Sequence, residues 1–296
     1  MRRTLLLAGA AVALIAAAPP AKPLTPSEIV KAAPAAAWRA IDPEDLMVID
    51  LKNGKQVIVQ LAPQFAPVHV ANIRALARAN WWTGAAVYRV QDNYVAQWGN
   101  NESEKPIPKG VVEKPPAEYH RSLRGLVIHA LGSPDAYAPR AGFTMGWPVA
   151  SDPKAGTANL PHCYASVGVG RGLSPDTGMG GELYAAIGHA PRHLDRVIAV
   201  VGRVIEGIEN FSSLPRGTEA LGFYKERSSD MPIAQVRLAA DIPAPERPSF
   251  QYMDTQSPSF AAYVKGRANR QDDFFIRSAG GVDLCNAPVP LRRAPK

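Results

Sequence analysis

The chain has 296 residues and a formal net charge of +7, and 28 of its residues are prolines. This length suits one large domain, or one domain with extensions, and the prolines favour loops, turns and edge strands over long helices. The basic residues are scattered, without Lys/Arg runs or interleaved aromatic side chains, which argues against a nucleic-acid-binding protein.

The first residues are typical of a secretory signal peptide. Arg2 and Arg3 precede an apolar run from Leu5 to Ala18, which is shorter than the about 20 residues that a membrane span needs. We therefore predict that residues 1–18 are removed on export, although the cleavage point stays open. The mature protein is then expected in the periplasm or outside the cell, without a membrane span. An uncleaved N-terminal anchor is the alternative.

Turn signals and hydrophobic periodicity predict many short strands and few helices. Residues 19–45 are rich in Pro and Ala and are predicted to form a linker. Asn53–Gly54 is a strong hairpin turn, and Asp92–Asn93 marks a second turn. In chain order, we predict helices at 26–33, 68–80, 208–214 and 260–264, and strands at 46–51, 55–61, 86–90, 94–98, 126–131, 142–145, 164–169, 183–188, 198–205 and 236–239.

The strand-rich part, residues 46–240, is predicted to form one mainly β domain, an antiparallel barrel or sandwich. Polar stretches at 100–118 and 151–160 are predicted to be loops. Prolines dominate again from residue 241, so residues 241–296 are expected to form a C-terminal extension that packs on the body and is not a second domain.

Two cysteines, Cys163 and Cys285, lie far apart in the sequence. A disulfide between them can persist in an oxidising compartment, and it would tie the C-terminal extension to the body. On a loop-entropy model such a bridge stabilises the fold by about 4–5 kcal/mol. Two free, buried cysteines are the alternative.

Four separated segments resemble the sequence motifs of the cyclophilins, in the order in which that family has them. Residues 66–76, APVHVANIRAL, are similar to Val-Pro-x-x-x-x-Asn-Phe-x-x-Leu. Residues 87–100, VYRVQDNYVAQWGN, match the spacing of Phe-His-Arg-Val-Ile-x-x-Phe-Met-x-Gln-Gly-Gly-Asp without a gap. Residues 180–185 and 194–204 resemble Gly-Ser-Gln-Phe-Phe-Ile and Leu-Asp-Gly-x-x-x-Val-Phe-Gly-x-Val.

The resemblance implies a mainly β fold, a closed eight-stranded antiparallel barrel capped by two helices. Here those helices would be the ones predicted at 68–80 and 208–214. The likeness fails between Gly99 and Gly170, where this chain is longer than compact members, so an enlarged loop region is expected there.

The resemblance also implies a peptidyl-prolyl cis–trans isomerase, which needs no cofactor and no metal. Rotation about a prolyl bond is slow because amide resonance sets a barrier of about 20 kcal/mol. A fixed guanidinium lowers the barrier by donating a hydrogen bond toward the prolyl nitrogen as its lone pair localises. Arg89 would be this guanidinium, and Gln97 would hold the substrate carbonyl. Their even separation across the predicted turn lets both side chains share one face of the sheet.

An apolar pocket for the proline ring is implied as well. The expected substrate-binding residues are Tyr88, Tyr94, Val95, Glu182, Tyr184, His193, Leu194 and Ile198. Tyr88, Glu182 and Ile198 stand where the family has His, Gln and His, and His193 is nearest to a Trp of the pocket rim. The expected substrates are Pro-containing segments of envelope or secreted proteins, and the protein is expected to act as a monomer.

Other functions stay open on the sequence alone. The main alternative is a cyclophilin-like module that binds or chaperones Pro-containing segments but isomerises them weakly, and a structural envelope protein is another. Metal binding by His189 and His193, or by His162 beside Cys163, lacks a complete ligand set. The Gly-rich stretch 168–172 lacks the phosphate-loop pattern, and no Gly-x-Ser-x-Gly elbow supports a serine hydrolase.

Overall fold

The computed structural model describes residues 23–100, 105–270, 272 and 274–295. The predicted signal peptide, residues 1–18, lies outside this part of the chain. Within it, no helix has both the length and the apolar character that a membrane crossing requires.

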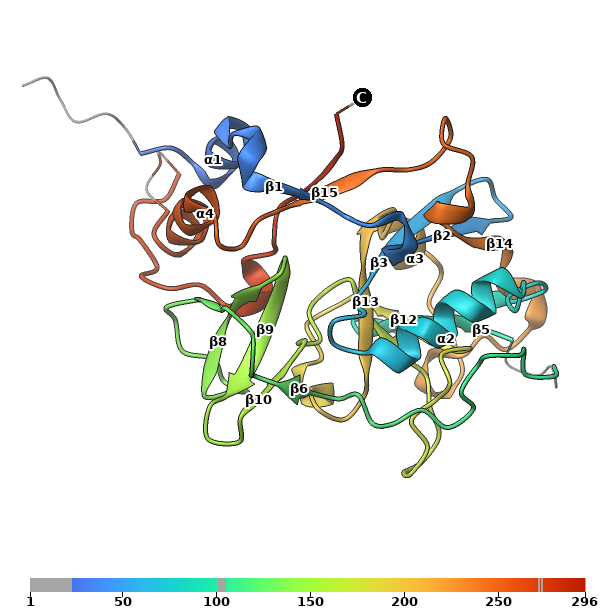
Figure 1. Ribbon diagram of the computed structural model, residues 1–296. Helices are drawn as coiled ribbons and strands as arrows, with labels where there is room; N and C mark the ends of the chain where they lie inside the picture. Colours follow the sequence, from blue (N-terminus) through green and yellow to red (C-terminus); the bar gives the residue numbers. More distant parts are fainter. Residues whose placement is uncertain (1–22, 101–104, 271, 273, 296) are drawn as a thin grey trace, which may run out of the picture.

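A closed barrel of eight strands forms the larger part of the molecule, on the right of Figure 1. Every neighbouring pair is antiparallel, and the order around the barrel is β11-β12-β5-β4-β14-β2-β3-β13. The mainly β architecture and the closed eight-stranded barrel are therefore confirmed. The strands are β2 (Leu46–Leu51), β3 (Gln56–Leu61), β4 (Ala86–Val90), β5 (Val95–Gly99), β11 (Ser166–Val169), β12 (Leu183–Ala186), β13 (Val200–Glu206) and β14 (Met231–Leu238).

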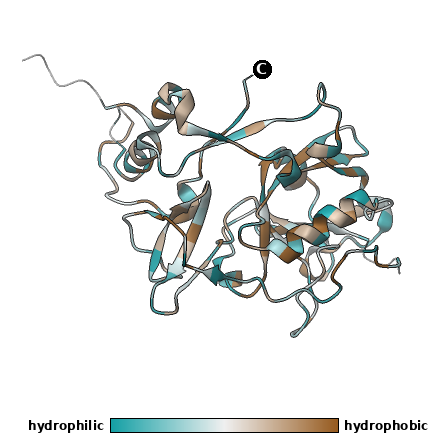
Figure 2. Ribbon diagram, in the orientation of Figure 1, coloured by the Kyte–Doolittle hydropathy of each residue, from teal (hydrophilic) through white to brown (hydrophobic). Residues whose placement is uncertain are grey.

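Two helices cover the barrel, close to the predicted positions. They are α2 (Pro67–Arg78) and the short α3 (Glu209–Ser212). Ile73 and Leu76 of α2 and Phe211 of α3 are fully buried in the barrel core. The ring of Phe211 lies 5.0 Å from that of Trp98 on β5. Hydrophobic residues accordingly follow the barrel strands and one side of α2 in Figure 2.

The N-terminus of α2 is capped by a residue from a distant loop. The N-cap position, Ala66, has no side chain that could accept a hydrogen bond. Instead the Glu118 carboxylate accepts the backbone N–H groups of Val68 and His69, each at 2.9 Å. A carboxylate there also faces the positive end of the helix dipole. The described part of the loop predicted at 100–118 is thus fixed to α2 through Glu118.

A second sheet is inserted between β5 and β11. Its order is β6 (Arg121–Ser122), β10 (Thr157–Asn159), β9 (Trp147–Asp152), β8 (Arg140–Thr144) and β7 (His129–Ala130). The prediction of a loop at 151–160 is wrong, because this stretch contains the end of β9 and all of β10. The Asp152 carboxylate accepts the N–H groups of Lys154 and Ala155, which confines the polar residues to one tight turn.

A third sheet brings the two ends of the described chain together. It has the order β1 (Trp38–Ala40), β15 (Phe250–Met253) and β16 (Leu291–Arg293), and it is accompanied by α1 (Pro26–Ala32) and α4 (Pro258–Ala268). The helix predicted at 26–33 is therefore confirmed, whereas the strand β1 was not predicted in the stretch interpreted as a linker, 19–45. The helix predicted at 260–264 is part of the longer α4.

The inserted sheet and the terminal elements share a second hydrophobic core, on the left of Figure 1. Trp38 from β1, Phe143 from β8 and Phe260 from α4 are buried in it. The rings of Phe143 and Phe260 meet edge to face at 5.0 Å. We call this cluster the second core; its other buried members are Ala37, Leu131, Ala141, Met253, Tyr263, Val264, Leu284, Ala287 and Val289.

Candidate active site

The candidate site lies on the outside of the hairpin formed by β4 and β5. Val87 pairs with Trp98 and Arg89 pairs with Gln97, so a β-bulge falls between these two pairs. The bulge places two residues, Tyr88 and Arg89, opposite one. Val87 and Val90 both belong to the barrel core, whereas Tyr88 and Arg89 between them do not.

Arg89 is held by hydrogen bonds from each of its three nitrogens. Nη1 donates to Gln97 Oε1 at 2.9 Å, Nη2 to Gln91 Oε1 at 2.6 Å, and Nε to the Leu221 carbonyl at 2.7 Å. The guanidinium also lies 5.4 Å from the ring centre of Phe223. Burial lowers the pKa of Arg89 from its ordinary value. Among the described residues, no carboxylate lies within ion-pairing distance of this guanidinium.

Gln97 is oriented by a second line of hydrogen bonds. Its Nε2 donates to the Tyr88 hydroxyl at 2.6 Å, and that hydroxyl donates to Glu182 Oε2, also at 2.6 Å. The other carboxylate oxygen accepts the N–H of Asn100 at 2.7 Å. Burial raises the pKa of Glu182, and burial together with the adjacent Glu182 carboxylate raises the pKa of Tyr88. A side chain at Gly99 would collide with the Glu182 carboxylate in its present position, so a larger residue there would displace Glu182.

A hollow of about 260 Å³ opens beside Arg89 and Gln97. Seven predicted site residues line it: Arg89, Tyr94, Val95, Gln97, Tyr184, Leu194 and Ile198. Tyr88, Glu182 and His193 do not line it. Tyr88 and Glu182 lie behind Gln97, and the exposed His193 stacks on Tyr94 with ring centres 6.1 Å apart.

The remaining lining residues were not predicted from the sequence. They are Val169, Gly170, Arg171, Leu221 and Phe223. The stretch with Leu221 and Phe223 contains no recognisable motif. It reaches the site because the N–H of Tyr224 bonds the Tyr88 carbonyl at 3.1 Å and because Phe223 forms a bridge with Arg89. Arg171 lies in the Gly-rich stretch, whose glycines suggested only turns.

The arrangement combines a fixed cation, an amide and an apolar hollow. A guanidinium has five N–H groups, and Arg89 uses three of them on protein acceptors, so two remain for a bound molecule. Tyr94, Val95 and Leu194 offer apolar surface at the same hollow. Such a site can hold an apolar ring and direct a charged donor at it without any nucleophile.

Comparison with known proteins identifies the family. The model of the family described as cyclophilin type peptidyl-prolyl cis-trans isomerase/CLD matches residues 46–238. The chain belongs to the cyclophilin-type peptidyl-prolyl cis–trans isomerases. It is 27% identical over 181 residues to proteins named probable peptidyl-prolyl cis-trans isomerase from Brucella suis and Brucella melitensis, a match that covers 61% of this chain and 76% of each relative.

A solved structure has the same fold over a longer stretch. Cyclophilin AquaCyp293 from Hirschia baltica aligns with a TM-score of 0.68 and 24% identity, over 86% of this chain and 93% of its own. That alignment is longer than the part matched by the family model. The likeness in fold to this cyclophilin therefore extends beyond the barrel.

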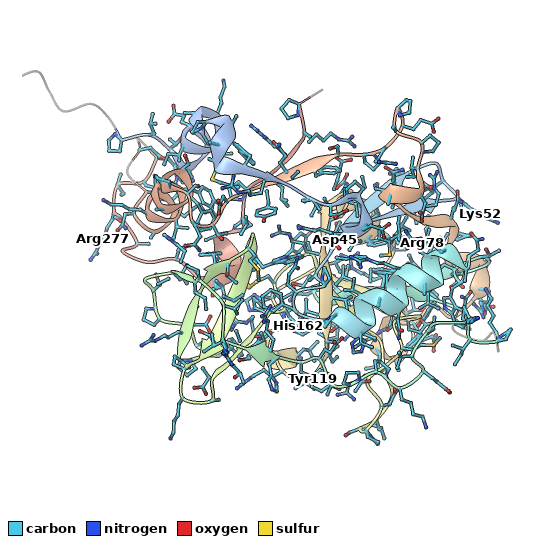
Figure 3. The ribbon with its side chains drawn as sticks, in the orientation of Figure 1. Asp45, Lys52, Arg78, Tyr119, His162 and Arg277 are labelled. Carbon is cyan, nitrogen blue, oxygen red and sulfur yellow. A yellow bond between two sulfur atoms is a disulfide. The ribbon has the colours of Figure 1, made fainter. Side chains whose placement is uncertain are left out.

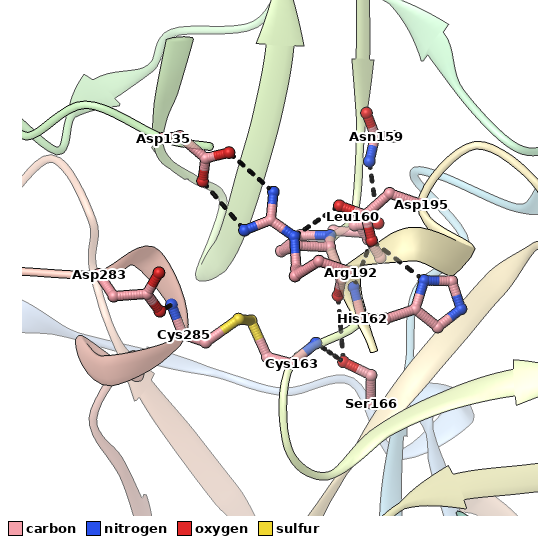
Figure 4. The surroundings of a disulfide bond; sticks show 11 residues. Asp135, Asn159, Leu160, His162, Cys163, Ser166, Arg192, Asp195, Asp283 and Cys285 are labelled. Carbon is pink, nitrogen blue, oxygen red and sulfur yellow. Dashed lines mark hydrogen bonds and ion pairs between the residues drawn. A yellow bond between two sulfur atoms is a disulfide. The ribbon is translucent and has the colours of Figure 1, made fainter. Parts of the chain in front are cut away.

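In the present protein, a buried polar network lies behind Tyr184, which lines the hollow, and Figure 4 shows four members of this network, His162, Asp195, Arg192 and Asp135. The Tyr184 hydroxyl lies 2.9 Å from Nε2 of His162, and Nδ1 of His162 lies 3.1 Å from the Asp195 carboxylate. Asp195 accepts from Arg192, which also pairs with Asp135 of the inserted region at 2.9 Å. His162 is fully buried in the interior of the molecule (Figure 3). The network therefore links Tyr184 to the inserted region.

The predicted disulfide between Cys163 and Cys285 is present, directly beside His162 (Figure 4). It joins the loop before β11, at Cys163, to the C-terminal extension, at Cys285. Cys163 is thus unavailable as a metal ligand, and within the described ranges no group of three or more His, Cys, Asp or Glu side chains could hold a metal ion.

Proposed function

We propose that the hollow beside Arg89 binds the proline ring of an exported polypeptide and that Arg89 accelerates rotation of the preceding peptide bond. The observation that carries the proposal is the Arg89 guanidinium, 2.9 Å from Gln97 and without a carboxylate partner among the described residues, at the edge of an apolar hollow. As the bond twists, the prolyl nitrogen gains a localised lone pair. A free N–H of Arg89 then binds the twisted state more strongly than the planar state, which is the condition for catalysis.

Gln97 is proposed to hold the substrate carbonyl. Its Oε1 is taken by Arg89, and one N–H of its Nε2 is taken by Tyr88. The second N–H of Nε2 is free to donate to a carbonyl oxygen. Because both ends of the amide are held by neighbours, this N–H needs little ordering when a substrate binds.

Substrates in the cell envelope or outside the cell are proposed from two features of the chain. The basic and apolar start of the sequence supports export. The Cys163–Cys285 disulfide fits an oxidising compartment. We expect cell fractionation to recover the protein in the periplasm or the medium, with an N-terminus near residue 19 by mass spectrometry. Recovery in the cytoplasm with the first 18 residues intact would contradict this placement.

The catalytic role is tested with Arg89→Ala. We expect measurable isomerase activity in the wild type, and a kcat/KM at least about tenfold lower in the variant, because one charge-assisted hydrogen bond to the transition state is lost. A protease-coupled assay on Pro-containing tetrapeptides measures it. Arg196→Ala is the matched control, since Arg196 is exposed and does not line the hollow. Equal activity of wild type and Arg89→Ala would contradict the role.

A weakly catalytic binding module is the second candidate. It is favoured by the bond from Arg89 Nε to the carbonyl of Leu221, a residue that lines the hollow, because this bond occupies one of the donors of Arg89. Peptide binding measured by calorimetry, with no rate above the spontaneous one in the assay, would support this candidate over the isomerase.

A further inference from the structure

The hollow has a second cation, Arg171, at its edge. Arg171 follows Gly170, whose backbone lies against the Gln97 amide: a β-carbon at Gly170 would be 3.4 Å from Gln97 Nε2. A residue bound next to the proline therefore lies within reach of Arg171. Nothing in the reaction proposed for Arg89 and Gln97 needs this second charge.

Arg171 is held by neutral groups, and no described carboxylate forms an ion pair with it. Its Nη1 donates to the Gly172 carbonyl at 2.8 Å and its Nη2 to the Val197 carbonyl at 3.1 Å. Its guanidinium carbon lies 6.0 Å from the ring centre of Tyr119. Its Nε is buried and has no hydrogen-bond partner among the residues that the structure describes, which is costly for a donor.

Within the described ranges, the surroundings of Arg171 contain no carboxylate that pairs with this group. None of the described residues that line the hollow is Asp or Glu. Hydrogen bonds from backbone N–H groups are the main cause that lowers the pKa of Asp176, and the nearby charge of Arg171 lowers this pKa further. Its oxygens accept the N–H groups of Gly172 at 2.6 Å and Gly178 at 2.9 Å, and no ion pair joins it to Arg171 within the described part of the chain.

We propose that Arg171 makes this isomerase select prolyl peptides that carry a carboxylate side chain, Asp or Glu, close to the proline. The inference rests on the proposed function of the hollow and names its substrate class. Two guanidinium groups without an ion-pair partner among the described residues, Arg89 and Arg171, give the hollow a positive potential, and that potential attracts an acidic peptide and repels a basic one. A charge-assisted contact at a partly exposed edge is expected to change kcat/KM by about five- to tenfold.

The test compares peptides that differ only in charge near the proline. Three series of short peptides place Glu, Gln or Lys two residues before, immediately before or immediately after the proline. For each protein, kcat/KM is measured for every peptide, and the readout is the Glu-to-Lys ratio within a series. Because the ratio compares peptides on the same protein sample, a loss of folded protein cancels.

In at least one series, we expect the wild type to prefer Glu over Lys by about five- to tenfold. Arg171→Gln should remove most of this preference, Arg171→Glu should reverse it, and Arg171→Lys should retain part of it. The control Arg196→Gln removes the same charge from an exposed residue that does not line the hollow, and it should keep the wild-type ratio. Raising the salt to about 0.5 M should shrink the ratio, because exposed charges are screened.

Failure of this inference and failure of the proposed function give different results. If the wild type isomerises none of the peptides, the proposed function is wrong. If it isomerises Glu and Lys peptides equally in all three series, the isomerase stands and the selection is overturned. A ratio that persists unchanged in Arg171→Gln overturns it as well, and leaves Arg171 as a side chain that fastens its loop to the Val197 carbonyl.

Discussion

Two side chains that depart from the family pattern, Tyr88 and Glu182, are hydrogen-bonded to each other in the structure. The sequence motif located Arg89 and Gln97 at the hollow, but it assigned Tyr88 and Glu182 to substrate contact, and they lie behind Gln97 instead. A motif gives positions along the chain and does not show which replaced residues contact one another. Here the phenol and the carboxylate replace the family's His and Gln together, and the pair holds Gln97 from behind.

Tyr88→Phe tests this support. The variant leaves Gln97 Nε2 and Glu182 Oε2 without their shared partner, so kcat/KM should fall about five- to tenfold, in line with the loss of about 1 kcal/mol. Glu182→Gln should cost a similar amount, whereas the double variant should cost clearly less than the sum. A double-mutant cycle on kcat/KM measures this coupling. Strictly additive effects would show that the two residues do not act on Gln97 as one unit.

At the scale of elements, the bulge in β4 decides which side chains reach the site. If the pairing of Val87 with Trp98 continued regularly, Arg89 would lie opposite Ala96, whose side chain belongs to the barrel core. The bulge moves Arg89 opposite Gln97 instead. The prediction that the pair shares a face is thus confirmed, but sequence periodicity contained no signal for the bulge. Backbone pairing settles it, and alternation alone cannot.

The cap of α2 is another contact between elements that the sequence did not predict, because Glu118 is distant in the chain. Glu118→Gln should lower the free energy of unfolding by about 1 kcal/mol, since an amide cannot accept the Val68 and His69 N–H groups with two oxygens. Urea unfolding measures the loss. Glu113→Gln is the matched control, because Glu113 is exposed in the same loop. An equal, small effect of both variants would contradict the capping role.

At the scale of the whole molecule, the second core could not be predicted from the sequence. Trp38, Phe143 and Phe260 meet there, yet they belong to a stretch predicted as a linker, to a weak strand and to a short helix. The Pro- and Ala-rich composition of 19–45 favoured a linker. The strand in this stretch, β1, instead forms by pairing with β15, which lies more than 200 residues away in the sequence. Such long-range pairing has no local signature.

The disulfide should contribute much of the stability of this assembly. It joins cysteines 122 residues apart, and on a loop-entropy model its loss costs about 4–5 kcal/mol. Calorimetry of Cys285→Ser should therefore show a Tm lower by roughly 10 °C. Reductant should lower the Tm of the wild type to a similar value and leave the variant unchanged. A wild-type Tm that is insensitive to reductant would contradict this role of the bond.

Because the second core combines residues from both ends of the described chain, it affects how the protein tolerates truncation and how it folds during synthesis. A fragment cut to the family-matched residues, 46–238, would keep Leu131 and Phe143 but lose Trp38 and Phe260, which cover them. That fragment would expose a hydrophobic surface to solvent and would be prone to aggregation. During synthesis, β1 leaves the ribosome early and its partner β15 leaves near the end. The strand β1 therefore stays unpaired until almost the whole chain has been synthesised.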